Sequence, residues 1–162
     1  MAATSPEQLR RLFDRHAAAL ALYARQWSDD PEDVVQDAFI QLARHRGPID
    51  RPAPWLFRVV RNGAIAASRG RDRRRKREAR ASAGEAWFAA TDDQIDARHI
   101  EKLLFELDVS IREVIVARLW GGLTFDEIAQ LQGCSTATAH RRYQSGLARL
   151  QERLAPHDHA RT

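Results

Sequence analysis

Apolar residues recur every three or four positions along most of this chain, and that spacing is typical of amphipathic helices. No stretch alternates apolar and polar residues as a half-buried strand does, so the pattern predicts an all-α fold. The expected helices cover residues 6–27, 31–44, 55–69, 95–107 and 111–120, and two more lie within 123–154.

The helical pattern is interrupted at two places. Residues 45–54 contain one glycine and three prolines, which exclude a continuous helix and predict a loop. Residues 71–93 are basic and rich in alanine, with few apolar residues to bury, which favours a linker. We therefore expect two small helical domains, at 5–70 and 94–155, joined by this basic linker.

The stretch from Leu123 to Leu150 carries the signals of a helix-turn-helix. Thr124 and Glu127 have the spacing of a capping box at the start of its first helix. Gly133 follows that helix, where a positive φ angle ends many helices, and Ser135 offers a cap for the second helix. Two helices joined by so short a turn form the unit that many DNA-binding proteins use.

The second of these helices has an apolar and a polar side. The residues expected to be buried are Ala139, Tyr143, Leu147, Leu150 and Leu154. The polar and basic residues near its start are Ser135, Thr136, Thr138, His140, Arg141 and Arg142. A helix with this distribution can lie in the DNA major groove. An ordinary helical hairpin with a solvated charged face is the alternative.

Two faces in the first domain also carry polar groups. Opposite the apolar residues of the 31–44 helix lie Asp33, Gln36, Asp37 and Gln41. The 55–69 helix gathers Arg58, Arg61, Asn62 and Arg69 within about a third of a turn. Its expected inner stripe is Leu56, Val59, Val60, Gly63 and Ala67, and Trp55 is expected to join the core rather than to stack on a base. Each polar face also has a plainer interpretation as a solvated surface.

The charge of the chain favours a polyanionic partner. Its 162 residues have a net charge of +4 and a pI of about 10.0. Residues 69–80 hold eight Lys/Arg against two acidic residues, so this segment either contacts phosphates or is a solvated linker. The single cysteine, Cys134, suits a reducing cytoplasm, and no apolar run is long enough to span a membrane.

No group of residues has the spacing of a catalytic or metal site. The six histidines do not cluster with cysteines at zinc-ligand spacing, and His157 and His159 supply too few ligands. No nucleophile and base, glycine-rich phosphate loop or inward pair of carboxylates is evident. We therefore expect no enzymatic activity, no metal and no cofactor.

Three motifs, in order, carry a family resemblance: DPEDVVQDAFIQL, PAPWLFRVVRN and IREVIVARLWGGLTFDEIAQLQGCS. Together they resemble the extracytoplasmic function (ECF) sigma factors, the two-domain members of the sigma-70 family. The resemblance implies a bacterial protein that binds core RNA polymerase, directs it to promoter DNA, and is held in check by an anti-sigma factor. A stand-alone helix-turn-helix regulator is the alternative, and a small nucleic-acid enzyme is a third possibility.

The resemblance also assigns roles to the polar faces. Asp33, Gln36, Asp37 and Gln41 would dock on the clamp helices of the largest polymerase subunit. Arg58, Arg61, Asn62 and Arg69 would contact the opened −10 element, and the 45–54 loop would read a flipped base. The residues near the start of the last helix, from Ser135 to Arg142, would contact the −35 duplex.

The sequence departs from the family pattern at several positions in the second domain. Leu107-Asp108 stands where Leu-Pro is common, and Leu131-Gln132 reverses the usual small-then-Leu order. Ala139 replaces a larger buried residue. Gly146 lies inside a helix, where glycine is about 1 kcal/mol less favourable than alanine. At Ala139 the packing is expected either to be looser or to be compensated by Tyr143.

Overall fold

The computed structural model describes residues 4–71 and 93–158, and within these ranges it contains helices and no strand. The all-α prediction is therefore confirmed for this part of the chain. The chain divides into two compact units, residues 1–85 and 86–162. The linker predicted at 71–93 lies outside the described residues except at its two ends, so its boundaries stay a prediction.

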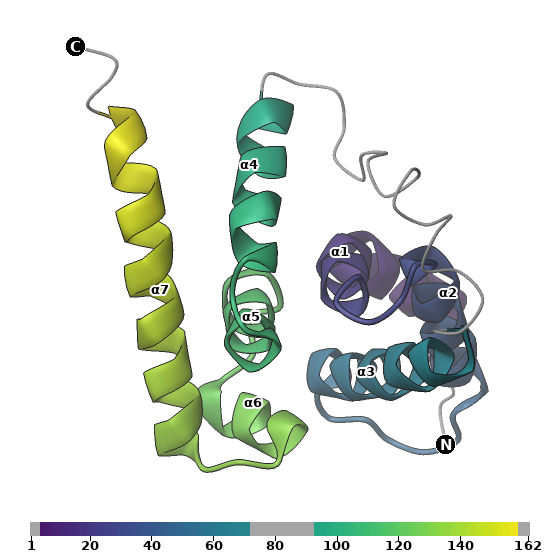
Figure 1. Cartoon of the computed structure of the whole chain (residues 1–162). Coiled ribbons are helices and arrows are strands. Elements are labelled where there is room, and N and C mark those ends of the chain that lie inside the picture. Colours follow the sequence, from purple (N-terminus) through teal and green to yellow (C-terminus); the bar gives the residue numbers. More distant parts are fainter. Residues whose placement is uncertain (1–3, 72–92, 159–162) are drawn as a thin grey trace. The chain divides into compact units, whose positions relative to one another are not determined.

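The first unit consists, in its described part, of α1 (Pro6–Ala24), α2 (Pro31–Arg44) and α3 (Pro52–Arg71), each packed against the other two (Figure 1). The predicted start of α1 is confirmed, because Ser5 and Gln8 form a capping box. The core contains fully buried Leu20 and Tyr23, and the Tyr23 ring lies 4.9 Å from that of Phe57. This core fixes how α2 and α3 present their outer faces.

In the first unit, two helix boundaries and one capping interaction differ from the predictions. Helix α1 ends at Ala24 rather than near Trp27. Helix α3 begins at Pro52, because prolines fit the first turn of a helix, where the missing N–H would have no helical partner. Asp30 is the N-cap of α2, but its side chain makes no capping hydrogen bond; its own N–H donates to Ser28 Oγ at 3.1 Å.

The predicted inner stripe of α3 is partly wrong. The fully buried residues are Leu56, Phe57, Val60 and Ala64. Val59 and Ala67 are half-buried and Gly63 is exposed, because they face the side of α2 rather than the core. Trp55 is half-buried, with its ring 5.6 Å from that of His45, so it joins the edge of the core and not its centre.

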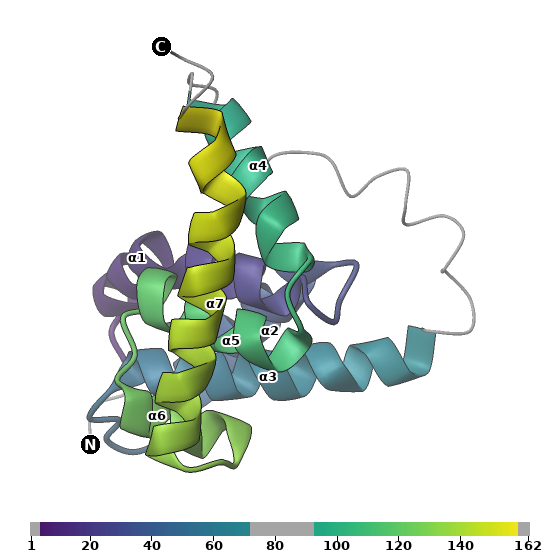
Figure 2. The same cartoon turned by 60° about the vertical axis from the view of Figure 1, so that its left-hand side comes forward.

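The second unit consists, in its described part, of α4 (Asp93–Phe105), α5 (Val109–Ile115), η2 (Val116–Trp120), α6 (Phe125–Gln132) and α7 (Thr136–Asp158). Helix α5 passes directly into η2, one turn of π-helix. Figure 2 shows α7 running along α4 and α5, with α6 near its N-terminal end. The long α7 is therefore anchored on α4, α5 and α6.

The buried stripe of α7 also differs from the predicted one. Ala139 and Leu150 are buried as expected, but Tyr143 and Leu147 are half-buried and Leu154 is 39% exposed. Gly146 is buried at the contact with α5. A Cβ atom added there would lie 2.8 Å from Ile111 Cγ2, closer than Cβ atoms approach other non-bonded atoms. The missing side chain of Gly146 thus lets α7 and α5 approach closely.

Candidate functional site

The helix-turn-helix is present as predicted, and its first helix begins with a complete capping box. The Glu127 N–H donates to Thr124 Oγ1 at 3.2 Å, and the Thr124 N–H donates to Glu127 Oε1 at 3.3 Å. Leu123 and Ile128, on either side of the box, are fully buried. Because both ends of the box are satisfied, the direction in which the chain enters α6 is fixed.

The turn between α6 and α7 has the geometry that its sequence indicates. Gly133 has φ 68° and ψ 38°, the left-handed conformation that glycine tolerates best. The Cys134 N–H donates to the Ala129 carbonyl at 3.0 Å, and the Thr138 N–H donates to Ser135 Oγ at 3.1 Å. Ser135 thus caps α7, and the turn holds both helices in one arrangement.

Most candidate DNA-binding residues of α7 are exposed, but they also contact one another and α6. The Thr136 hydroxyl donates to Asp126 Oδ1 at 2.6 Å, and Arg141 Nη2 donates to Thr138 Oγ1 at 3.2 Å. The exposed His140 ring lies 5.0 Å from that of Phe125. These contacts give the outer face of α7 a defined shape.

Arg142 is half-buried and is joined to the last residue of α6. Its Nη1 donates to Gln132 Oε1 at 2.9 Å. Sequence reasoning missed this link, and it also missed Phe125, which carries the Arg118 guanidinium 4.7 Å from its ring. The reversed Leu131-Gln132 order was the signal available for Gln132, because it puts an amide where the family has an apolar residue.

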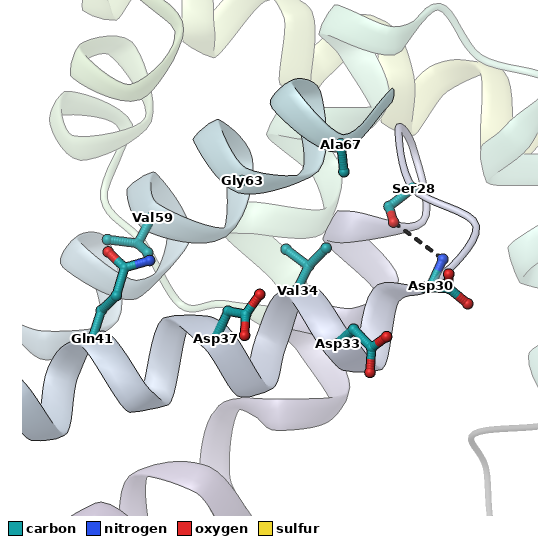
Figure 3. Close-up of a pocket in the computed structure, with 9 residues that line it drawn as sticks. All are labelled: Ser28, Asp30, Asp33, Val34, Asp37, Gln41, Val59, Gly63 and Ala67. Carbon is teal, nitrogen blue, oxygen red and sulfur yellow. Dashed lines mark hydrogen bonds between the residues drawn. The ribbon is translucent and has the colours of Figure 1, made fainter. Parts of the chain in front are cut away.

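In the first unit, the acidic face of α2 borders a hollow of about 140 Å³ against α3 (Figure 3). Asp33, Asp37 and Gln41 lie one turn apart along its α2 side. Its α3 side is formed by Val59, Gly63 and Ala67, with Val34 between the two helices. Gln36 is exposed on the same helix as Asp33 but does not line the hollow.

The cationic face of α3 lies opposite its buried stripe. Arg58, Asn62 and Arg69 are exposed, as the helical spacing predicts. Arg61 is half-buried, with its guanidinium carbon 5.7 Å from the centre of the Trp27 ring. The structure thus brings all four residues onto one side of α3.

Among the residues that the structure describes, no group of three or more His, Cys, Asp or Glu side chains could hold a metal ion. None of the described helices is long and apolar enough to cross a membrane.

Two family models match the chain. The model described as Sigma-70 region 2 matches residues 12–74, and the model described as ECF sigma factor matches residues 54–156.

Curated relatives match most of the chain. The RNA polymerase sigma factor CarQ of Myxococcus xanthus is 32% identical over 151 residues, which cover 88% of this chain and 87% of the relative. The ECF RNA polymerase sigma factor SigL of Mycobacterium tuberculosis is 31% identical over 157 residues, covering 87% and 85%.

Two solved structures are also similar to this chain. The sigma factor RpoE, in a complex with the anti-sigma factor NepR from Bartonella quintana, aligns with a TM-score of 0.68 at 26% identity, covering 93% of this chain and 98% of that one. CnrH, in a complex with the cytosolic domain of CnrY, aligns with a TM-score of 0.61 at 25% identity, covering 94% and 90%.

Proposed function

Because this chain belongs to the ECF sigma factors, we propose that it binds core RNA polymerase and directs it to promoters to start transcription. The observation that carries the proposal is the match of the ECF model over residues 54–156, which spans both the cationic α3 and the helix-turn-helix. A stand-alone helix-turn-helix regulator is not favoured, because such a protein has no need of a first unit of the Sigma-70 region 2 type.

We propose that polymerase docks on the α2 face formed by Asp33, Gln36, Asp37 and Gln41. Support comes from their exposure and from the adjoining hollow, whose Gly63 leaves room beside the carboxylates. Such a face fits a partner helix that presents cationic side chains.

We propose that Arg58, Arg61, Asn62 and Arg69 contact the opened −10 element. Unpaired DNA is bound by cations along its backbone and by stacking of its bases. The exposed arginines of α3 supply cations for the DNA backbone. The contact of Arg61 with Trp27 orients one further guanidinium.

We propose that α7 reads the −35 duplex with the residues at its N-terminal end, which are Ser135, Thr136, Thr138, His140, Arg141 and Arg142. Recognition helices of this type contact base edges near their start. Threonine hydroxyls suit phosphates, and arginine suits guanine or phosphate.

Sigma factors as a family are not enzymes, and we propose that the chemistry of RNA synthesis belongs to the polymerase. An anti-sigma factor is a further proposed partner, because a structural neighbour was solved with one. The proposed site of action is the cytoplasm, where polymerase and promoters meet.

Run-off transcription with purified core polymerase tests the proposal. On a promoter library with randomised −10 and −35 elements, addition of the protein should enrich one class of start sites. A protein that neither binds core polymerase nor changes start-site selection would refute the proposal.

The docking face has its own test. Asp33→Arg and Asp37→Arg should each weaken core binding, measured with labelled protein, while the helix content stays unchanged. Asp14→Arg, an equal charge change at an exposed position of α1, is the matched control and should bind normally. Unchanged core affinity in both α2 variants would remove these residues from the interface.

A further inference from the structure

Gln132 links the candidate DNA-reading Arg142 to a helix outside the helix-turn-helix. Its Oε1 accepts from Arg142 Nη1 at 2.9 Å. Its Nε2 donates to the Ser110 carbonyl at 2.8 Å and to Glu113 Oε2 at 3.1 Å. One amide therefore connects the recognition helix α7 with α5.

The chemistry of these partners fixes the orientation of the amide. A guanidinium only donates, whereas a carbonyl and a carboxylate only accept, so the oxygen of Gln132 must face Arg142 and its nitrogen must face α5. Glu113 is 4% exposed, which makes it a buried and well-held acceptor. Gln132 is the last residue of α6 and precedes the turn glycine, so its backbone is also fixed.

We propose that Gln132 is a positioning residue for −35 recognition, an inference that rests on the proposed function. By engaging Nη1 it holds the Arg142 guanidinium in one orientation and leaves the Nη2 and Nε donors for a base edge or a phosphate. A preorganised arginine loses less conformational freedom when it binds, and it discriminates better because its donors cannot follow a wrong base. An arginine released from this bond would contact several bases with similar strength.

The plainer role for Gln132 is purely structural, joining α6 to α5. The two roles predict different effects of a Gln132 substitution on binding to the various −35 sequences. A structural defect lowers binding to every −35 sequence alike. A positioning defect lowers the preference for the correct sequence over its single-base variants, and it does so only while Arg142 is present.

The test uses the full-length protein with core polymerase on the promoter that the wild type selects, and on variants with each −35 base pair changed. Gln132→Met keeps the length and packing of the side chain but removes both hydrogen-bonding groups. Gln130→Met is the matched control, at an exposed position of the same helix. Gln132→Leu, which restores the leucine common in the family, is a second variant to use should the methionine variant fail to fold.

Gln132→Met should reduce discrimination at one or two adjacent base pairs by about five-fold, the lower end of what one good base contact contributes. Gln130→Met should keep the wild-type profile. In an Arg142→Ala background, Gln132→Met should reduce discrimination no further. An unchanged profile in Gln132→Met or in Arg142→Ala, or an even loss across all −35 sequences, overturns the inference. A wild-type protein without promoter-specific transcription refutes the proposed function instead.

Discussion

Replacing Gly146 with alanine sets helix propensity against interhelical packing. Propensity alone favours alanine by about 1 kcal/mol inside a helix. The new Cβ would lie 2.8 Å from Ile111 Cγ2 and 2.9 Å from both Cδ1 and Cγ1 of Ile115. Overpacking of a core costs about 1–3 kcal/mol. The side chains of Ile111 and Ile115 must move to make room, and this cost exceeds the gain in helix propensity. We therefore expect a net destabilisation of the second unit by about 1 kcal/mol.

A matched control is available in the first unit. Gly63 is also helical, but it is exposed, and an added Cβ would lie 3.6 Å from Val34 Cγ1, an ordinary contact. Gly63→Ala should therefore stabilise α3 by about 0.5–1 kcal/mol. Native-state amide hydrogen exchange in the full chain reports the opening free energy of each helix separately, which keeps the two units apart.

The sign of the change in opening free energy shows whether packing or helix propensity dominates at Gly146. If Gly146→Ala slows exchange in α5 and α7, as Gly63→Ala should in α3, then the close contact does not limit packing and the reasoning is refuted. Ile115→Val provides a second check, because it removes Cδ1. In a double-mutant cycle it should couple favourably with Gly146→Ala by at least about 0.5 kcal/mol.

Two further predictions concern stability. Thr124→Ala removes the cap of α6 and should lower the opening free energy of the helix-turn-helix by about 1 kcal/mol; unchanged exchange in α6 would contradict it. Burial, together with the charge of Arg15, lowers the pKa of His16 from its usual 6.5. Its contribution to stability is therefore present above pH 6.5 and is lost as the pH falls through the lower folded value. His16→Gln should flatten this part of the pH–stability curve, measured by urea unfolding, and an identical slope would contradict the assignment.

The helix-turn-helix could be predicted from sequence because its determinants are local. A capping box spans four residues, and a glycine after a helix needs no distant partner to take a positive φ. Both are found in the structure, at Thr124 and Gly133. The exposed face of α2 could also be predicted from sequence, because helical spacing alone puts Asp33 and Asp37 opposite Val35 and Phe39.

The burial pattern of α3 and α7 could not be predicted in the same way. Helical spacing gives one apolar direction, but each of these helices meets several neighbours, and which neighbour covers which side is decided by the tertiary packing. Gly63 and Gly146 illustrate this. The same residue type inside a helix is exposed at one position and tightly packed at the other.

Two of the departures from the family pattern, Gln132 and Gly146, both lie against α5. Gly146 lies one turn after Arg142 on α7 and contacts Ile111 and Ile115. Gln132 joins Arg142 to Ser110 and Glu113 of α5. The close approach of α7 to α5 at the glycine therefore sets the distance that the amide has to bridge.

This coupling yields a last prediction. Gly146→Ala should push α7 away from α5 and loosen the bond between Gln132 and Arg142. At temperatures where the variant stays folded, it should lose −35 discrimination at the same base pairs as Gln132→Met does. The matched control is Ala148→Gly, a change of similar size at an exposed position two residues further along α7. It should alter the stability of the helix but not the discrimination among −35 base pairs. Loss at different base pairs, or an even loss at all of them, would mean that the glycine supports α7 generally and not the position of Arg142.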